Sequence, residues 1–526
     1  MRRIGIDVGG TNTDAVLVEE GRVAAAVKAP TTPEVTSGIL DALARLAATG
    51  RVAAGALDAV MIGTTHFINA VVQRRDLSRV GALRIGLPAS ASLPPFCDWP
   101  GALADLVCGH VAMVEGGHEY DGRPFMPLDT AAIRREAQAM RAAGLRSVAV
   151  SSVFSPLDPS HEREAAAILR EEMGDVAVTL SSDLGRIGLL ERENAALLNA
   201  ALADLARETI AAFARALARS GLSAPLYITQ NDGTVVGAAE AMRLPVYSFA
   251  SGATNSMRGA AYLSGIADAL VADVGGTTTD IGELRLGFPR EANNVVAIGG
   301  VRTLFRMPDL LSFGLGGGSH VSDDGSAVGP VSVGYRLSAD ALAFGGHQLT
   351  ATDVGVAAGL VDIGDRAKVG HLDRAICERA LARIRSMLED HVDRVKTDAG
   401  DVILLAVGGG AFLVPEGLEG VSSVLRLPHG DCANAVGAAI AQVSGEIDQV
   451  FRDMSREEAL AEAARLAAAR AVASGADPAT LTVVDSEDIP IAYLPGNARR
   501  IRVRCVGDIG LSRRDLAAGP DPRSAS

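Results

Sequence analysis

The sequence predicts an α/β protein of two or three domains, and three observations bear on this fold class. The chain has 526 residues, which is enough for two or three domains with well-buried cores. Nearly half of the residues are hydrophobic but only 4% are aromatic, and small apolar residues suit helices packed closely on sheets better than a β-sandwich. An acidic, glycine-rich stretch near the N-terminus returns about halfway along the chain as a second matched copy.

Each copy of the repeated stretch predicts a β-hairpin with a tight, polar turn. An apolar run leads into Asp-Val-Gly-Gly-Thr, Thr-Asp comes next, and a second apolar run follows, over residues 4–16 and 270–281. The glycines allow a ligand to approach the backbone, and their N–H groups with the threonine hydroxyls suit an anion. The strand-end carboxylates of Asp7 and Asp273 suit Mg²⁺ held partly through water. One copy would also be explained as a plain tight turn, but two matched copies favour a ligand site.

Together with these hairpins, further motifs resemble those of the actin-like ATPase superfamily and, within it, the hydantoinase A/oxoprolinase family. They are Gly63-Thr64-Thr65 with Asn69-Ala70, the glycine-rich loop 312–319, Gly329-Pro330, Gly345-Gly346, residues 349–353 and Gly408-Gly409-Gly410. The chain departs from the family pattern at residues 251–256, where a proline and two later glycines of the family loop are missing. The resemblance covers almost the whole chain.

The resemblance implies two actin-like (ribonuclease H-like) α/β domains that face each other across a nucleotide cleft. Residues 1–185 are expected to form the N-terminal domain, 186–450 the second domain, and 451–526 a short C-terminal segment with a helix and strands on the body. Residues 88–127 are predicted to be an irregular insertion beside the cleft, and residues 187–220 one long helix that joins the domains.

In such proteins each hairpin contacts the nucleotide phosphates from one side, and the resemblance implies roles for individual residues here. Asp7 and Asp273 are the expected catalytic residues and Mg²⁺ ligands, partly through water. The expected ATP contacts are Gly9, Gly10, Thr11, Thr13, Gly275, Gly276, Thr277, Thr279, Gly408, Gly409 and Gly410. The expected substrate contacts are Thr64, Thr65, Asn69, Ser251, Gly317 and Ser319. Taken alone, the Gly-Thr-Thr turn would equally be explained as a capped helix start.

The activity that the resemblance implies is ATP-dependent opening of a cyclic amide, such as a hydantoin or an oxoproline. An amide is a poor electrophile, and phosphorylation of its oxygen would give an imidate-like carbon that water can attack. A hydantoinase B-type partner subunit is expected as well, because no part of this chain resembles one. The alternatives are an ATP-using subunit of an acetone-carboxylase-like carboxylase, a small-molecule kinase, and a filament or regulatory ATPase without a small substrate.

Two further polar groups allow both a functional and a structural interpretation. His161 and Glu162 open a predicted helix and could serve as general bases, but a surface cap is the simpler interpretation. Arg192, on the predicted long helix, could reach a ligand or take part in a solvated ion pair.

Composition excludes several classes of partner. A formal net charge of −14 argues against a nucleic-acid groove and offers no basic face to an anionic membrane. The three lysines, Lys28, Lys368 and Lys396, lie outside any Gly-x-x-x-x-Gly-Lys loop, which excludes a P-loop. The five cysteines form no C-x-x-C pair, and neither a signal peptide nor a membrane-spanning apolar run is found, so we expect a soluble, cytoplasmic protein. The nine histidines show no spacing typical of metal ligands.

Overall fold

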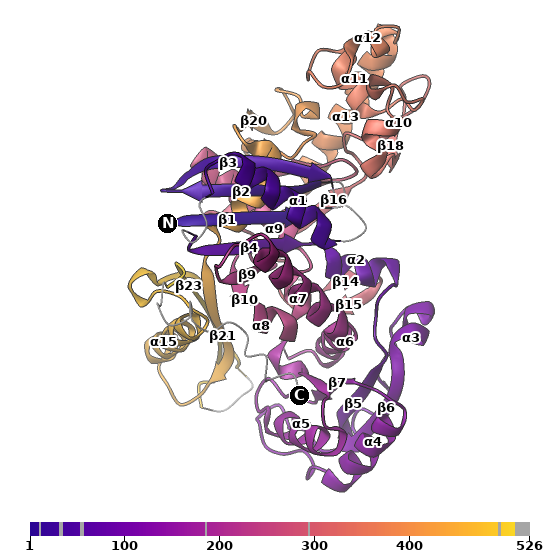
Figure 1. Ribbon diagram of the computed structural model, residues 1–526. Helices are drawn as coiled ribbons and strands as arrows, with labels where there is room; N and C mark the ends of the chain where they lie inside the picture. Colours follow the sequence, from indigo (N-terminus) through magenta and orange to yellow (C-terminus); the bar gives the residue numbers. More distant parts are fainter. Residues whose placement is uncertain are drawn as a thin grey trace.

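The computed structural model describes residues 1–9, 12–30, 35–52, 57–184, 187–292, 295–492 and 496–510. Three larger β-sheets, of nine, six and four strands, organise the chain. In Figure 1 the strands β1 to β4 lie in the middle of the molecule, the four-stranded sheet lies below them, and helices α10 to α13 lie at the top. These helices are α10 (Leu337–Asp340), α11 (Ala351–Ala357), α12 (Arg366–Val369) and α13 (Arg374–Val395).

The nine-stranded sheet, with its helices called here the first lobe, is built from both ends of the chain. In sheet order its strands are β22 (Thr482–Pro490), β23 (Arg499–Gly507), β21 (Val443–Phe451), β10 (Val235–Gly237), β9 (Leu226–Thr229), β4 (Ala59–Thr64), β1 (Arg2–Val8), β2 (Asn12–Glu19) and β3 (Arg22–Pro30). β1 and β2 are almost continuously buried, because helices cover both faces of the sheet. Helices α1 (Val35–Ala48) and α7 (Ala203–Arg219) pack on one face, and α14 (Ala433–Ile440) packs on the other.

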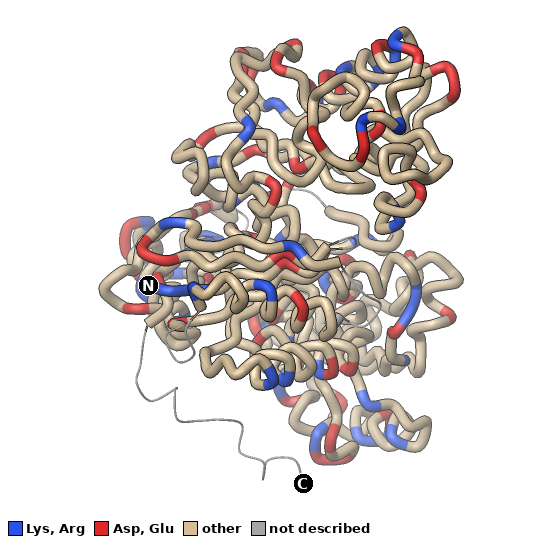
Figure 2. The backbone as a smooth tube through the Cα atoms, turned by 45° about the horizontal axis from the view of Figure 1, so that its top comes forward, with Lys and Arg blue, Asp and Glu red and all other residues tan. Residues whose placement is uncertain are grey.

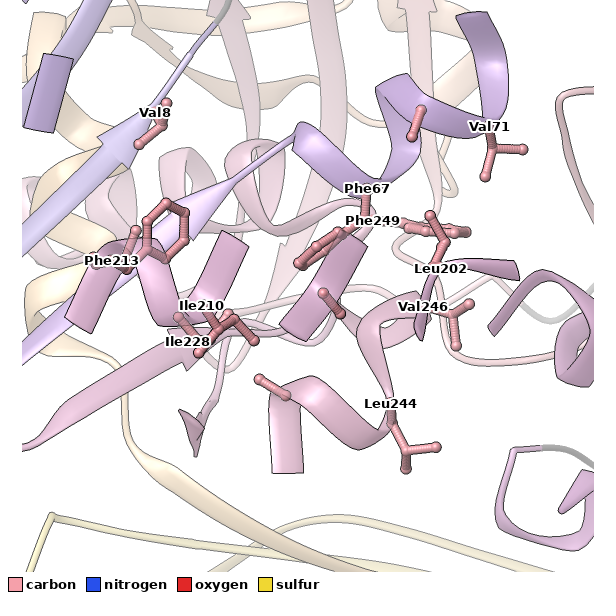
Figure 3. Packing of buried hydrophobic residues seen from close by; sticks show 14 of the residues in the cluster. Val8, Phe67, Val71, Leu202, Ile210, Phe213, Ile228, Leu244, Val246 and Phe249 are labelled. Carbon is pink, nitrogen blue, oxygen red and sulfur yellow. The ribbon is translucent and has the colours of Figure 1, made fainter. Parts of the chain in front are cut away.

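The largest hydrophobic core lies between this sheet and helices α2 (His66–Gln73), α6 (Leu189–Ala201) and α7. Figure 3 shows part of it, with Phe67 of α2, Phe213 of α7 and Phe249 among the labelled side chains. All three rings are buried, and each such burial contributes roughly 1.5–3 kcal/mol relative to exposure. The burial of Phe67 holds the start of α2, and with it the Gly63-Thr64-Thr65 turn, against the body.

The six-stranded sheet, with its helices called the second lobe, repeats the hairpin arrangement of the first. β11 and β12 are antiparallel and β11 is parallel to β19, as β1 is antiparallel to β2 and parallel to β4. Its strands are β13 (Phe288–Pro289), β12 (Thr279–Arg285), β11 (Ala269–Val274), β19 (Val402–Val407) and β20 (Val421–Arg426), and β16 (Leu310–Phe313) also pairs with β12. Helices α11 and α13 cover one face of this sheet.

Two helices, α9 (Ser251–Ser264) and α14, carry the chain from one lobe to the other and pack directly on each other. α9 packs on the second sheet and α14 on the first. Small residues make the contact possible, because a Cβ on Gly259 would lie 1.9 Å from the Ala433 carbonyl oxygen. A Cβ on Gly437 would likewise lie 1.8 Å from the Asn255 carbonyl oxygen. The two crossovers therefore meet at the point where the lobes face each other.

The four-stranded sheet corrects the prediction for residues 88–127. That segment contains α3 (Gly101–Val107) and β6 (Cys108–Glu115), and it is part of a larger unit with a parallel sheet. The sheet order is β6, β5 (Val80–Leu87), β7 (Ser147–Ser152) and β8 (Ala177–Leu180), and helices α4 (Thr130–Ala142) and α5 (Ser160–Met173) pack beside it. β6 is an edge strand with several half-exposed residues, so it lacks the continuous apolar run that marks the central strands.

The sheet pairing also differs from the predicted division of the chain at residue 185. Strands β9, β10 and β21 lie within the range predicted for the second domain, but they pair in the first sheet. The first sheet therefore includes strands from both sides of residue 185, and the domain limits stay a prediction. In the C-terminal segment, α15 (Arg456–Ala473) packs on β21 and β23, and extends the first lobe. The predicted helix 187–220 is divided at Leu202 into α6 and α7.

The surface-cap and solvated-pair interpretations of Glu162 and Arg192 are wrong. Both side chains are fully buried, with Arg192 Nη1 3.7 Å from Glu162 Oε1. Glu162 accepts hydrogen bonds from the backbone N–H groups of Ser152 and Ser182 (2.9 Å each) and Arg192 donates to Ser155 Oγ (2.8 Å). The pair joins α6 to the four-stranded sheet, which no local sequence signal could show.

Charged residues of both signs are distributed along the whole tube in Figure 2. No helix in the described part of the chain is both long enough and apolar enough to cross a membrane.

Candidate functional site

The two glycine-rich turns are each closed by an equivalent backbone hydrogen bond. In the first hairpin the Gly9 N–H donates to the Asn12 carbonyl oxygen (3.1 Å), and in the second the Gly275 N–H donates to the Thr278 carbonyl oxygen (2.9 Å). The strand registers match as well, because Asp7 lies opposite Asp14 and Asp273 lies opposite Asp280. The sequence repeat is therefore a structural repeat. Gly10 and Thr11 lie outside the described residues.

A row of side-chain positions crosses each sheet at the level of the strand-end acid. In the first lobe the row is Lys28, Asp14, Asp7 and Gly63, on β3, β2, β1 and β4. In the second lobe it is Ser312, Asp280, Asp273 and Val407, on β16, β12, β11 and β19. Each strand-end acid thus has a second acid on one side and the end of a parallel strand on the other.

Asp7 is buried and held by a side chain from the far end of the chain. Asn434, at the start of α14, donates from Nδ2 to Asp7 Oδ2 (2.8 Å). The other oxygen, Oδ1, is buried and has no hydrogen-bond partner among the described residues. It lies beside two glycines, since an added Cβ would lie 2.7 Å from Oδ1 at Gly63 and 3.9 Å from it at Gly252. This oxygen is therefore placed between the β4 turn and the start of α9.

Asp273 lies against the triglycine turn that follows β19. A Cβ on Gly408 would lie 2.4 Å from Asp273 Oδ1, and the φ angle of Gly408 is +83°, so only glycine is accommodated without strain. The Gly410 N–H donates to the Val274 carbonyl oxygen (2.7 Å), which fixes the turn on the end of β11. Gly409 has open space around its Cα and is exposed. The turn thus presents backbone beside the second acid.

Both strand-end acids carry raised pKa values. Burial, together with the charges of Asp14 and Asp273, raises the pKa of Asp7 to about 7, against the opposing hydrogen bond from Asn434. Burial also raises the pKa of Asp273 to about 6, and a hydrogen bond from Ser256 of α9 opposes this. Such shifts are expected where carboxylates are brought together away from water without a balancing charge.

Asp7 and Asp273 suit a divalent cation whose coordination shell is completed by ligands other than protein side chains. Oδ1 of Asp7 makes no hydrogen bond among the described residues, while the Asn255 amide lies near the carboxylate and opposes the rise of its pKa. Asp7 also lies within the electrostatic reach of Asp273. Within the described ranges, no three His, Cys, Asp or Glu side chains are grouped closely enough to hold a metal ion by themselves. Mg²⁺ is commonly bound by one or two carboxylates with water and phosphate oxygens, which matches a sparse donor set of this kind.

The glycine-rich loop 314–319 packs backbone against backbone on the second turn. The N–H groups of Gly317 and Gly318 donate to the carbonyl oxygens of Gly275 (3.0 Å) and Gly276 (2.7 Å). Ser319 is buried, and its Oγ accepts from the Gly316 N–H (2.9 Å). The contacts of Gly317 and Ser319 in this structure therefore brace the second hairpin, and a role in substrate contact stays a prediction.

The other predicted substrate residues lie where β4 ends and α9 begins. The Ser251 hydroxyl lies 3.2 Å from the Thr64 carbonyl oxygen and 3.4 Å from the Thr64 nitrogen, which joins the two segments beside Asp7. Asn69 Nδ2 donates to Thr65 Oγ1 (3.2 Å) on the exposed side of α2. The structure thus brings Thr64 and Ser251 together, and it places Asn69 one turn further out.

Thr13 and Thr279, whose hydroxyls occupy equivalent positions in the two copies of the repeat, are fully buried. Thr279 donates to the Leu315 carbonyl oxygen (2.8 Å), which ties β12 to the glycine-rich loop. Thr277 by contrast is exposed at the turn. Phosphate contact by these three hydroxyls stays a prediction, and the burial of Thr279 favours a bracing contact for it.

Four side chains that contact the acids were not among the predicted site residues: Lys28, Ser256, Ser312 and Asn434. Lys28 bonds to Asp14, Ser256 to Asp273, Ser312 to Asp280 and Asn434 to Asp7. Only Lys28 could have been found from the sequence, because a hairpin between two adjacent strands places it opposite Asp14. The other three come from distant parts of the chain.

The sheets and the paired hairpins define a two-lobed α/β protein in which each lobe carries one acidic hairpin. The chain belongs to the hydantoinase/oxoprolinase family: the family's N-terminal region matches residues 3–173 and its hydantoinase/oxoprolinase region matches residues 192–407. These two regions contain both acidic hairpins and β19, the strand that leads into the triglycine turn.

Curated relatives are subunits of larger enzymes. The caprolactamase subunit alpha of Pseudomonas jessenii is 29% identical over 419 residues, which are 74% of this chain and 58% of that subunit. The acetophenone carboxylase gamma subunit of Aromatoleum aromaticum is 26% identical over 85% of this chain and 69% of its own length. The acetone carboxylase beta subunit of Xanthobacter autotrophicus is 25% identical over 75% of this chain and 59% of its own length. The chain thus spans well under two thirds of some of its relatives.

Two solved structures share the fold over 97% of this chain and 88% of their own. The ATP-dependent caprolactamase from Pseudomonas jessenii superposes with a TM-score of 0.76 at 22% identity. The nucleotide-free structure of acetone carboxylase superposes with a TM-score of 0.67 at 18% identity.

Proposed function

We propose that this chain is the ATP- and Mg²⁺-dependent subunit of an enzyme that phosphorylates and opens a cyclic amide. The observation that carries the proposal is the pair of acidic hairpins on facing lobes, which share an equivalent turn hydrogen bond and the same strand register, with Asp7 and Asp273 at equivalent positions. The relatives support ATP use, because the caprolactamase and the acetone carboxylation mechanism are both described as ATP-dependent. A hydantoin, an oxoproline or a lactam is the proposed substrate class.

In the proposed mechanism each lobe supplies one acid and one backbone turn. Asp7 and Asp273 would hold Mg²⁺, partly through water, and the ion would neutralise charge on the phosphates. The turn of each hairpin would present N–H groups to the phosphates, and the Gly408-Gly409-Gly410 turn would let the nucleoside pass close to the backbone. Closing of the lobes would exclude water and align the amide oxygen with the terminal phosphate.

A carboxylase-type reaction is the second candidate, because two curated relatives are carboxylase subunits and one of them matches 85% of this chain. The same acids and turns would serve it, since activation of an oxygen by phosphorylation is common to both reactions. We also propose a partner subunit, of the hydantoinase B type for ring opening, because the three curated relatives are themselves subunits of multi-subunit enzymes.

Thermal unfolding with nucleotide tests the core of the proposal. Mg-ATP at 100 times its Kd should add about 2.7 kcal/mol to the free energy of unfolding. The shift should disappear when EDTA removes the cation, and it should be absent with a nucleoside that lacks phosphates. No shift at millimolar Mg-ATP or Mg-ADP would reject nucleotide binding.

Turnover assays then separate the two reactions. ATP hydrolysis by the chain with its partner should rise with a lactam, a hydantoin or oxoproline if ring opening is the function. Stimulation by bicarbonate with a ketone, and by none of the cyclic amides, would instead establish the carboxylase alternative.

A further inference from the structure

Lys28 connects the first acidic hairpin to a segment more than 400 residues later. It lies in β3, where the antiparallel register places it opposite Asp14. Its Nζ donates to Asp14 Oδ1 (3.0 Å) and to the backbone carbonyl oxygen of Asp431 (2.6 Å). The backbone of Lys28 is held as well, because Arg45 Nη1 donates to its carbonyl oxygen (3.1 Å).

Asp431 belongs to the crossover segment, residues 429–434, where the chain returns from the second sheet to the first. The second lobe holds this segment at Gly430, whose carbonyl oxygen accepts from the Gly408 N–H (2.9 Å). Lys28, from the first lobe, holds the very next residue. Adjacent carbonyl groups are thus bonded to opposite lobes, and movement of one lobe relative to the other must act on these two bonds.

The crossover segment also reaches the first strand-end acid. Its last residue, Asn434, lies in the first turn of α14 and donates to Asp7 Oδ2 (2.8 Å). Lys28 and Asp7 therefore hold the same short segment at two points, three residues apart. Because Asp7 lies opposite Asp14, the contacts of Lys28, Asp14, Asp7 and Asn434 close a ring through the segment.

The charge of Lys28 strengthens these contacts. Asp14 is nearly buried, with 7% of its side chain exposed, while Lys28 keeps 35% exposed. A charged donor to a nearly buried carboxylate forms a stronger bond than a neutral one. Electrostatically Lys28 also reaches Asp273, whose raised pKa it counteracts. One amine thus acts on an acid of each lobe and on the segment between them.

We propose that Lys28 is a positioning residue that couples the first acidic hairpin to the crossover segment 429–434, and so sets the place of Asp7 relative to the triglycine turn. This inference rests on the proposed function insofar as the coupling is used in nucleotide turnover. A Lys28 that only stabilised β3 would leave the segment unchanged when removed. The coupling role predicts a local effect far away in the sequence.

Two variants and a matched control test the coupling. Lys28→Met removes the charge and the donors at similar length, and Lys28→Arg retains both. Lys396→Met is the control, because Lys396 Nζ also donates to a backbone carbonyl oxygen, that of Gly420 (3.2 Å), away from the acids. Amide hydrogen exchange of a peptide covering residues 427–434 is measured in the nucleotide-free chain, and the kcat and KM of ATP turnover are measured in the complete enzyme.

In Lys28→Met we expect the amide exchange rate of this peptide to rise on the order of tenfold, because the hydrogen bond from Lys28 to the Asp431 carbonyl oxygen is lost. We also expect kcat to fall on the order of tenfold with a smaller change in KM for ATP. Lys28→Arg should recover most of both effects, and Lys396→Met should show neither. Exchange in Lys28→Met equal to that of the unmodified chain, or a rise that Lys396→Met reproduces, would overturn the proposal.

The two proposals fail separately. If the unmodified chain shows no thermal shift with Mg-ATP, the proposed function fails, and the exchange comparison still decides whether Lys28 holds the crossover segment. If nucleotide binds but kcat and KM are unchanged in Lys28→Met, the positioning role in turnover is overturned. Should Lys28→Met fold poorly, Lys28→Gln provides the same comparison with a polar side chain.

Discussion

The two acidic hairpins share one backbone but differ in what surrounds their acids. In the first lobe the second acid of the row, Asp14, pairs with Lys28, whereas in the second lobe Asp280 accepts a hydrogen bond from the Ser312 hydroxyl. Asp7 is 3% exposed, whereas Asp273 is half-buried beside the triglycine turn. Asp7 is held by the Asn434 amide of α14, and Asp273 is held by the Ser256 hydroxyl of α9.

This difference shows that the backbone and the charge of the site are set independently. Strand register decides where the four positions of each row lie, because opposite residues in a sheet are held at fixed spacing. The residue type on the outer strand decides the partner of the neighbouring acid: Asp14 contacts the charged Lys28, and Asp280 contacts the neutral Ser312 hydroxyl. Lys28, on the outer strand of the first lobe, also donates to the crossover segment, so its ammonium group lies where the lobes are joined.

The largest effect is expected from the strand-end acids. Asp7→Asn and Asp273→Asn should each lower ATP turnover by about 100-fold or more, roughly 3 kcal/mol of transition-state stabilisation, because each removes a charge that orients the cation. Melting temperatures should be nearly unchanged, since each substitution keeps the shape and removes a buried charge. Normal turnover in both variants would show that the hairpins are scaffold. A loss in only one would show that the two lobes share the cation unequally.

A smaller effect is expected from the glycines beside the acids. Gly408→Ala should lower the free energy of unfolding by about 2 kcal/mol, because its φ of +83° disfavours a side chain and the Cβ would lie 2.4 Å from the Val274 carbonyl oxygen. Gly63→Ala in the first lobe has no such φ, but its Cβ would displace Asp7, so we expect turnover to fall more than stability. Gly409→Ala is the control, with open space at that position. Denaturant unfolding and ATPase rates on the three variants check this contrast, and equal stability of Gly408→Ala and Gly409→Ala would contradict it.

The smallest effect is expected from the second acids of the rows. Asp14→Asn should destabilise the chain by about 1–2 kcal/mol, because it weakens a charged bond to a partly exposed lysine. Asp280→Asn should cost about 0.5–1 kcal/mol, since a hydroxyl donor is retained at Ser312. Chemical denaturation of the two variants tests the order. A larger loss in Asp280→Asn would mean that the hydroxyl contact, and not the lysine, is the stronger one.

Much of the local structure of the site could be predicted from the sequence. The hairpins around Asp7 and Asp273 could be predicted because the apolar runs, glycines and hydroxyls of each hairpin lie within one short segment, residues 4–16 and residues 270–281. The strand that ends at Val407 and the Gly408-Gly409-Gly410 turn that follows it could be recognised for the same reason. The insertion was predicted less well, because β6 is a half-exposed edge strand. The sheet to which β9, β10 and β21 belong could not be predicted either, because β9 and β21 also pair with strands far away in sequence.

The sequence by itself determined the two hairpins, their acids and the family, since these depend on short segments whose residue types dictate local geometry. The tertiary structure alone decided what holds the acids. Asn434 reaches Asp7 across 427 residues and Lys28 reaches Asp431 across 403. A hydrogen bond of this kind depends on how two sheets and two crossing helices pack, and on glycines that permit the crossing, so no spacing along the chain could reveal it.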